Sequence, residues 1–316
     1  MKKEDICLCP VCAEVNCDFV KNYTCHSKVL DGYEIRSCTN CNHCFIYPNI
    51  QEKIWDDYNE TYFLSAHGGI NQSSINIAYN TAISKIRFDY LKQIISLHKF
   101  NIKKVLEIGP GEGYFAKEFM INYSTVDYYA YESDTSLHNK LIENNINLLT
   151  NLDETISKDK FDLIIISHVL EHTLSPVKWL QDMTKNLRSS GLLFVEVPCQ
   201  DHKYKNMNEP HVMFFSKDSL KITAQKSGFE SINITFNGNK INNIIRFEFI
   251  KRIITKTLYK MKIFPLFKNC LNKSSIVDKY NLSSLESLAV FTTQPYATND
   301  SESRWLRLTA IKGKQK

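Results

Sequence analysis

Glycine and proline are scarce in this chain of 316 residues, which contains 10 glycines and 8 prolines. Collagen-like and low-complexity chains need far more of both, and a content of 43% hydrophobic and 23% charged residues is typical of folded proteins. No apolar run approaches the roughly 18 residues of a membrane-spanning helix. Residues 1–12 also lack the apolar centre of a secretory signal, so we expect a cytoplasmic protein. The length predicts about two domains.

Acidic residues are nearly absent from one segment, residues 246–273. It contains eight Lys or Arg and a single acid, Glu248, and so carries +7, whereas the whole chain carries +5. The remaining residues therefore sum to −2. A broad nucleic-acid-binding face needs positive charge over much of the surface, so we expect no nucleic-acid partner.

Cysteine is rare beyond residue 44, where only Cys199 and Cys270 occur, but eight cysteines lie within residues 1–44. Without a secretory signal, such clustering indicates metal binding rather than disulfides. Cys9-Pro-Val-Cys12 and Cys38-Thr-Asn-Cys41 are two C-x2-C pairs, whose four thiolates can complete the tetrahedral shell of a structural zinc ion. Expected strands at 33–36 and 45–47 flank the second pair, which predicts a zinc ribbon over residues 1–50.

Two alternatives to this ligand set stay open. An iron–sulfur cluster could use the same thiolates, or a neighbouring side chain could replace one of the four. The candidates for replacement are Cys7, Cys17, Cys25, His26, His43 and Cys44.

Residues 51–100 are predicted to form a helical connection, with a helix from about Ser74 to His98. An aromatic stripe precedes that helix, formed by Trp55, Tyr58, Tyr62 and Phe63. Stripes of this kind usually pack in a core; the alternative is a lid over a cofactor.

A glycine-rich loop follows an expected strand at 103–109. It reads Gly109-Pro-Gly111-Glu-Gly113 and leads into an expected helix at 114–122. Glycine is needed where the backbone turns with positive φ or approaches a ligand closely. The loop is neither the dinucleotide fingerprint nor the phosphate loop, and it contains acids, so it suits a ligand with a cationic amino group and a sulfonium better than a pyrophosphate.

Strands and helices alternate after this loop as in a parallel sheet with crossover helices. Further strands are expected at 126–131, 146–150, 161–167 and 192–197, and another begins at Phe229. Glu132 ends the second strand, about 20 residues after the loop, where a carboxylate can bind both hydroxyls of a ribose. Helices are expected from Pro176 and after Ser216.

The motifs Val105-Leu-Glu-Ile-Gly-Pro-Gly-Glu-Gly113, Phe161-Asp-Leu-Ile, His168-Val-Leu-Glu-His172 and Val195-Glu-Val-Pro198 resemble those of class I S-adenosylmethionine-dependent methyltransferases. The upstream cysteine pairs resemble the zinc-binding domain of bacterial sugar and glycan methyltransferases. The resemblance implies an α/β fold, with a Rossmann-like, seven-stranded, mostly parallel sheet in a catalytic domain over residues 101–240. Residues 241–316 would form a C-terminal extension with the last strands.

The resemblance also assigns residues to S-adenosylmethionine. Loop residues Glu107, Gly109, Gly111 and Gly113 would hold its methionine part, and Glu132 its ribose. Asn151, Leu152 and Asp153 would lie near adenine, and His168 near the reacting methyl group. The implied function is methylation of a small molecule or glycan precursor, with a nucleotide sugar as the first candidate.

His168-Val-Leu-Glu-His172 also fits the H-x-x-E-H pattern of zinc proteases. We reject that interpretation because the motif straddles the end of a strand. A milder version stays open, in which Glu171, His172 and another residue hold a divalent ion near the acceptor. The simpler interpretation is helix capping and packing.

Methyl transfer to a hydroxyl or an acidic carbon needs a general base, and histidine suits neutral pH. His168 and His211 are the candidates, since each follows a strand at the carboxyl edge where open α/β sheets bind ligands. Two other functions are kept as alternatives: an RNA base methyltransferase with an RNA-binding ribbon, and a non-enzymatic interaction protein on a degenerate cofactor fold.

The basic segment has helical periodicity. Phe247, Ile250, Ile254, Leu258, Met261 and Phe264 would share one side of a helix, opposite Lys251, Arg252, Lys256, Lys260 and Lys262. The apolar side could pack on the core, or it could lie on an anionic membrane surface. A peripheral membrane contact through 246–264 is therefore a second expectation for localisation.

Overall fold

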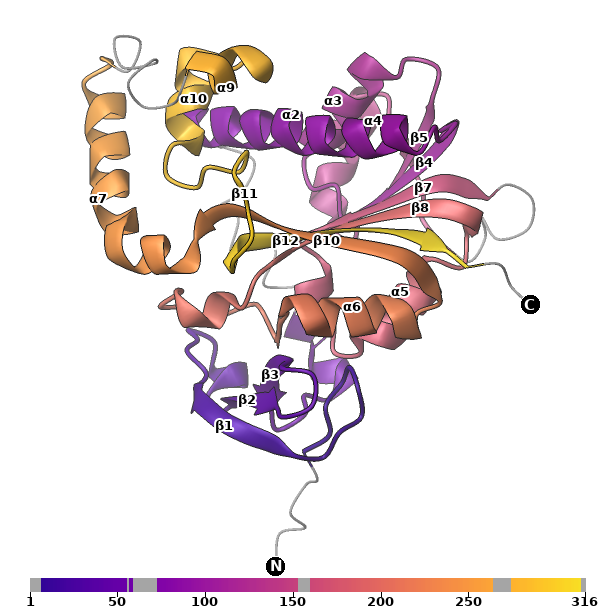
Figure 1. Ribbon diagram of the computed structural model, residues 1–316, viewed down its shortest axis with the longest axis vertical. Helices are drawn as coiled ribbons and strands as arrows, with labels where there is room; N and C mark the ends of the chain where they lie inside the picture. Colours follow the sequence, from indigo (N-terminus) through magenta and orange to yellow (C-terminus); the bar gives the residue numbers. More distant parts are fainter. Residues whose placement is uncertain (1–6, 56, 59–72, 153–159, 264–273, 314–316) are drawn as a thin grey trace, which may run out of the picture.

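The computed structural model describes residues 7–55, 57–58, 73–152, 160–263 and 274–313. It contains two sheets, a small one built mainly from the N-terminal residues and a large one flanked by helices on both faces (Figure 1). The α/β fold expected from the sequence is confirmed.

The large sheet has the strand order β11-β10-β12-β8-β7-β4-β5-β6. The five strands from β8 to β6 run parallel, and β12, β10 and β11 join antiparallel to their neighbours. Its eight strands exceed the expected seven because the two-residue β11 pairs with the outer part of β10. The strands are β4 (Lys104–Ile108), β5 (Asp127–Tyr131), β6 (Asn147–Leu148), β7 (Phe161–Ser167), β8 (Leu187–Pro198), β10 (Phe229–Lys240), β11 (Thr298–Asn299) and β12 (Ser303–Lys312).

The central strands bury both faces, which explains their continuous apolar sequence. Leu106 and Ile164 point into a core cluster that also contains ribbon residues, whereas Val105 and Leu163 point into a second cluster with helices α2 and α3. Helices α2 (Ser74–Leu97), α3 (Tyr114–Asn122) and α4 (His138–Glu143) cover one face, and α5 (Pro176–Met183) and α6 (Lys217–Lys226) cover the other (Figure 1).

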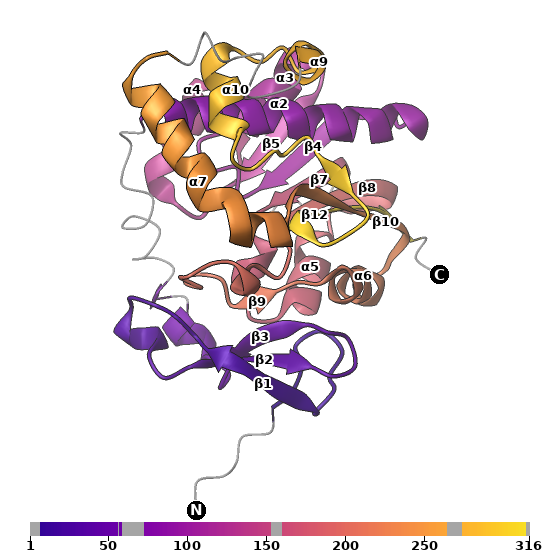
Figure 2. The ribbon, with the colours of Figure 1, turned by 60° about the vertical axis from the view of Figure 1, so that its left-hand side comes forward.

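The small sheet joins the N-terminal ribbon to a strand from much later in the chain. Its order is β1 (Cys17–Asn22), β2 (Glu34–Cys38), β3 (Cys44–Tyr47) and β9 (Met213–Phe214), all antiparallel. Strands β2 and β3 were expected, but β1 and β9 were not. In Figure 2, β9 lies between the ribbon and the helices below the large sheet, so the ribbon is a packed layer rather than a separate lobe.

After β10 the chain forms α7 (Ile241–Lys260), α9 (Ser274–Lys279) and α10 (Ser284–Val290) before β12 returns to the sheet. Helix α10 lies against α2, and α7 runs along the edge of the molecule (Figures 1 and 2). Within the described part of the chain, no helix combines the length and apolar character needed to cross a membrane.

Candidate functional site

The loop between β4 and α3 has three glycines in the left-handed region, with φ of +67° at Gly109, +57° at Gly111 and +78° at Gly113. A Cβ at Gly109 would come within 2.5 Å of Val169, and one at Gly113 within 2.9 Å of Ile146. These two glycines are therefore required by the protein's own packing. A Cβ at Gly111 would meet no atom within 4 Å, so the loop is open there.

Glu132 lies directly against this opening. One carboxylate oxygen accepts a hydrogen bond from the Gly111 amide at 2.9 Å, and the other accepts one from the Asp134 amide at 3.0 Å. Burial raises the pKa of Glu132, although these backbone hydrogen bonds counteract the effect. The structure thus brings together the loop and the acid that the sequence assigned to one ligand.

Glu107 is a second buried acid at the end of β4. The Tyr128 hydroxyl donates to it at 2.8 Å. Burial raises the pKa of Glu107 to about 7, against the lowering effect of the Tyr128 hydrogen bond and of Arg87. The group therefore titrates near neutral pH, and a cationic ligand beside it would favour its carboxylate form.

These features fit S-adenosylmethionine. An open glycine backbone and two buried acids can accept the cationic methionine part and a ribose. On the adenine side, Asn151 is exposed, and the half-buried Leu152 accepts a hydrogen bond on its carbonyl from Asn186 at 3.0 Å. Asp153 lies outside the described residues.

His168 follows β7 with a φ of +57°. Its Nδ1 lies 3.3 Å from Glu171 Oε1 and its Nε2 lies 3.2 Å from Glu196 Oε1. Burial alone would lower the pKa of His168, but the hydrogen bonds to these two carboxylates raise it to about 9. His168 therefore holds a proton at neutral pH, and both its ring nitrogens are engaged.

His211 and His172 meet at Glu171, and we call these three residues the Glu171 cluster. One ligand atom from each lies within 4.8 Å of the others, and the two imidazole rings pack edge to face at 4.9 Å between centroids. His211 Nδ1 lies 2.7 Å from Asp201 Oδ2, and its Nε2 lies 4.0 Å from Glu171 Oε1.

The charges around the cluster are uneven. Burial alone would raise the pKa of Asp201, but His211 and Lys205 lower it, so Asp201 is a carboxylate. Burial lowers the pKa of His172 to about 4, which leaves its ring neutral. Glu171 Oε2 is buried and has no hydrogen-bond partner among the described residues.

The ribbon holds the segment that carries His211. The Tyr23 hydroxyl donates to the His211 carbonyl at 3.0 Å, and the Ile46 amide donates to the Val212 carbonyl at 3.0 Å. The Val212 amide in turn donates to the Glu171 carbonyl at 3.0 Å. Backbone hydrogen bonds thus connect ribbon strand β3 to the Glu171 cluster.

Two aromatics of the predicted stripe contact the same region. Trp55 and Tyr58 are buried and stacked at 5.0 Å. Trp55 donates its indole N–H to the His172 carbonyl at 2.7 Å, and the Tyr58 hydroxyl donates to Glu209 at 2.5 Å. Tyr62 and Phe63 lie outside the described residues.

The four predicted cysteine ligands come together in the ribbon. The sulfurs of Cys9 and Cys41 are 3.6 Å apart, those of Cys12 and Cys38 are 3.4 Å apart, and all four lie within 4.8 Å of one another. Thiolates about 2.3 Å from one tetrahedral zinc ion stand about 3.8 Å apart, so the arrangement matches such a site closely.

The six alternative ligands make other contacts or lie elsewhere. His43 is buried between Ser219 and Met213, at 3.3 and 3.2 Å from its ring nitrogens. Cys17 donates weakly to the Cys7 carbonyl at 3.8 Å, and Cys25 to the Ser27 carbonyl at 3.4 Å. His26 is exposed, and Cys44 lines a cleft described next.

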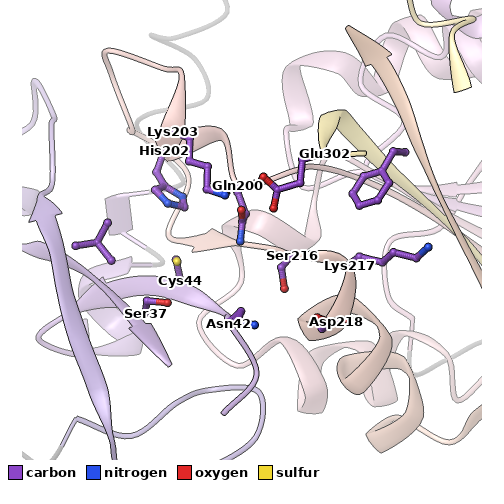
Figure 3. A pocket seen from close by; sticks show the side chains of 12 residues that line it. Ser37, Asn42, Cys44, Gln200, His202, Lys203, Ser216, Lys217, Asp218 and Glu302 are labelled. Atoms are coloured by element: carbon purple, nitrogen blue, oxygen red, sulfur yellow. Dashed lines mark hydrogen bonds and ion pairs between the residues drawn. The ribbon is translucent and has the colours of Figure 1, made fainter. Parts of the chain in front are cut away.

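A cleft of ≈ 550 Å³ lies between the ribbon and the N-terminal end of α6 (Figure 3). Its lining includes Cys44, His202, Lys203, Lys217 and Glu302. It contains none of the residues assigned to the cofactor, to the four-cysteine zinc site or to catalysis, and Cys44 is the one alternative metal ligand in its lining. The cleft is therefore separate from the site built around Gly111 and the Glu171 cluster.

Sequence reasoning missed Glu196 and Asp201. Glu196 is fully buried and accepts from Arg87 of α2 and Arg307 of β12, each at 2.5 Å. It therefore fixes His168 through a four-residue ionic network. The acid in Val195-Glu-Val-Pro198 was a signal, because a charge inside a buried strand needs partners. Asp201 offered no comparable signal.

Most of the predicted apolar side of α7 does not pack on the core, and Leu258 is its one buried member among the described residues. Phe247, Ile250, Ile254 and Met261 are exposed, as are Ile245, Ile253 and Phe249, the last to 75%. Phe264 lies outside the described residues. The other buried residues of the helix lie outside the predicted apolar side; they are Ile241, Ile244, Glu248 and Thr255.

Residues 84–234 match a family model described as a methyltransferase domain. This stretch contains the glycine loop, Glu132, His168 and the Glu171 cluster. The protein is an enzyme that uses S-adenosylmethionine, which confirms the expectation from the sequence.

Solved structures resemble the chain more distantly, and no curated protein sequence matches it. An S-adenosylmethionine-dependent methyltransferase from Archaeoglobus fulgidus is 16% identical, with a TM-score of 0.46, over 80% of this chain and 100% of its own. The plantazolicin methyltransferase BpumL, in complex with SAH, is 13% identical with a TM-score of 0.47, over 82% and 93%. Likenesses at this level say nothing about the acceptor.

Proposed function

We propose that this methyltransferase acts on an oxygen or an acidic carbon of a small molecule or glycan precursor, with a nucleotide sugar as the first candidate and His211 as the general base. The observation that carries the proposal is the pairing of His211 with the buried Asp201 at 2.7 Å. A carboxylate on Nδ1 fixes the ring and its tautomer, which leaves the lone pair of Nε2 for an acceptor proton.

The cofactor would be held by residues 107–113 and by Glu132. S-adenosylmethionine supplies the electrophilic methyl group, so the protein's task is alignment and proton removal. The Gly111 backbone would contact the ligand and Glu132 would bind its ribose hydroxyls. Near neutral pH, Glu107 would become a carboxylate when the cationic cofactor binds.

His168 is the weaker candidate for the base. A general base must be free of its proton before the reaction. His168 keeps its proton at neutral pH, because its two carboxylate partners raise its pKa to about 9. We assign it a positioning role, because it links Glu196 of the sheet to Glu171 of the cluster.

The polar character of the cluster favours an acceptor rich in hydroxyl groups. Glu171 Oε2 is a buried acceptor that a sugar hydroxyl could satisfy. The preference for a nucleotide sugar is supported by the resemblance of the cysteine pairs and the catalytic motifs to bacterial sugar methyltransferases.

A panel of nucleotide sugars, incubated with the enzyme and S-adenosylmethionine, tests this function by release of S-adenosylhomocysteine and by mass spectrometry of the product. His211→Gln should reduce kcat by at least about 100-fold, the usual contribution of a general base. The matched control is His98→Gln, because His98 is exposed at the end of α2. Methylation of RNA but of no sugar nucleotide would overturn the assignment.

We further propose that the ribbon binds one structural zinc ion through Cys9, Cys12, Cys38 and Cys41. The support is the mutual distance of the four sulfurs. Four thiolates close the coordination shell, so the ion would stabilise the ribbon rather than act on the substrate.

We also propose that α7 places the enzyme on an anionic membrane surface. Its exposed apolar residues are interspersed with the basic Arg246, Arg252, Lys256 and Lys260, which are also exposed. Apolar insertion together with basic residues is the combination that interfacial helices use, and each basic residue near such a surface contributes about 1 kcal/mol.

Sedimentation with liposomes tests the membrane contact. The protein should pellet with anionic vesicles and not with neutral ones. Phe249→Ser with Ile250→Ser should abolish binding, and so should charge reversal at Lys256 and Lys260. Equal recovery in the supernatant with both lipids would contradict the proposal.

A further inference from the structure

We propose that the Glu171 cluster is a second metal site, in which Glu171, His172 and His211 bind a divalent transition-metal ion. Two imidazoles and one carboxylate are a ligand set that suits zinc, manganese, iron or cobalt and leaves coordination positions open. The site would differ from the ribbon in having no sulfur ligand.

The first support is the orphaned oxygen of the carboxylate. Glu171 is only 1% exposed, and its Oε1 accepts from His168, whereas Oε2 has no partner among the described residues. A buried carboxylate oxygen without a partner carries an energetic cost that a cation would remove.

The second support is the orientation of both histidines. Metal-binding histidines usually donate their second ring N–H to a carboxylate or a backbone carbonyl. His211 pairs with Asp201 through Nδ1. A ring nitrogen of His172 hydrogen-bonds to the backbone of Pro210. Proline has no amide N–H, so His172 is the donor and its other nitrogen can bind an ion.

The distances require only a small contraction. His211 Nε2 lies 4.0 Å from Glu171 Oε1, and the three ligand atoms lie within 4.8 Å of one another. Ligands about 2.1 Å from a tetrahedral ion stand about 3.4 Å apart.

The ion and the acceptor proton would compete for the same lone pair of His211. In the metal-loaded protein His211 would be a ligand, and the ion would lower the pKa of an acceptor hydroxyl, whose proton would pass to solvent, in place of base action by His211. The inference goes beyond the proposed function, because ion binding can be measured with neither cofactor nor acceptor present.

Cobalt(II) titration of metal-free protein separates the two sites. Cobalt in the ribbon should give intense thiolate charge-transfer absorption, and cobalt in the Glu171 cluster only weak ligand-field bands. We expect two equivalents in the wild type. His172→Ala and Glu171→Gln should each lose the second equivalent but keep the thiolate band, which also reports that the ribbon is folded.

The control is His98→Gln, which should bind two equivalents. One equivalent in the wild type, or two in both cluster variants, would overturn the metal site. Either result leaves the methyltransferase assay untouched. Conversely, an inactive enzyme that still binds the second cobalt would count against the proposed function alone.

Discussion

The Tyr23 hydroxyl donates a hydrogen bond of 3.0 Å to the backbone carbonyl of His211. These residues are 188 positions apart in the sequence, one in the ribbon and one beside Glu171. The contact gives the ribbon a direct part in orienting the residue that we propose as the base.

We predict that Tyr23→Phe lowers kcat and leaves S-adenosylmethionine binding unchanged. A hydrogen bond of this kind contributes about 1 kcal/mol, which corresponds to roughly fivefold in rate. Steady-state kinetics and calorimetry give the two quantities. Tyr33→Phe in the same ribbon is the control and should keep full activity; a weaker cofactor affinity in Tyr23→Phe would point to general destabilisation instead.

Gly111→Val should weaken S-adenosylmethionine binding at least tenfold, about 1.4 kcal/mol. The side chain would fill the open space that we assign to the ligand. Gly228→Val is the matched control, because Gly228 also has positive φ (+88°) and no atom within 4 Å of a Cβ. It imposes a similar backbone strain away from the site. Calorimetric titration measures the affinity of each variant for S-adenosylmethionine. Equal affinity in both variants would contradict the assignment of the Gly111 loop to the cofactor site.

Cofactor binding should tighten as the pH rises from 6 to 8. The pKa of Glu107 is about 7 in the folded protein, so the carboxylate that attracts the cationic ligand forms over this interval. Below this pKa, the affinity for the cofactor can rise by at most about tenfold per pH unit. Calorimetry at three pH values measures the slope, and Glu107→Gln should flatten it. A slope unchanged in that variant would assign the dependence to another group.

The same group predicts a trend in stability. Its folded pKa lies above its usual value of 4.5, so between these values the native state holds more protons than the unfolded state. The contribution of Glu107 to the free energy of unfolding therefore falls as the pH rises from about 4.5 to 7. Urea denaturation of wild type and Glu107→Gln across this range should show the difference.

Zinc removal should disable the catalytic step before it affects cofactor binding. Cys9→Ser or Cys41→Ser should lose the ribbon zinc and unfold the ribbon, because a small domain without its metal has little core. Methyl transfer should then fail, since β9 and His211 lose their support. Metal analysis, calorimetry and activity distinguish these effects. Cys25→Ser should retain zinc, and a folded, active Cys9→Ser protein would contradict the assignment.

The alternation of strands and helices could be predicted because it depends on local pattern. The expected strand at 161–167 and helix at 114–122 agree with β7 and α3 in both bounds. The metal site could also be predicted from the cysteine pairs, because two thiolates separated by two residues can bind one ion in almost any structural context.

Long-range pairing could not be predicted. Strand β9 has two residues and exists because Phe214 pairs with Cys44, a partner distant in the sequence. The role of Asp201 could not be predicted for the same reason, because it depends on where the pairing of β9 places the nearby His211. For α7, periodicity identified an apolar side, but only the packing of Leu258 and Glu248 shows which side faces the protein.

Strand β12 is the last of the described strands to be translated, yet it lies between β8 and β10 in the sheet. During synthesis, β10 cannot join the rest of the sheet until β12 has left the ribosome. Arg307, one of the two arginines that neutralise Glu196, arrives with it. Until β12 emerges, the growing chain therefore holds a half-neutralised acid and an open strand edge on β8, where other nascent chains could pair.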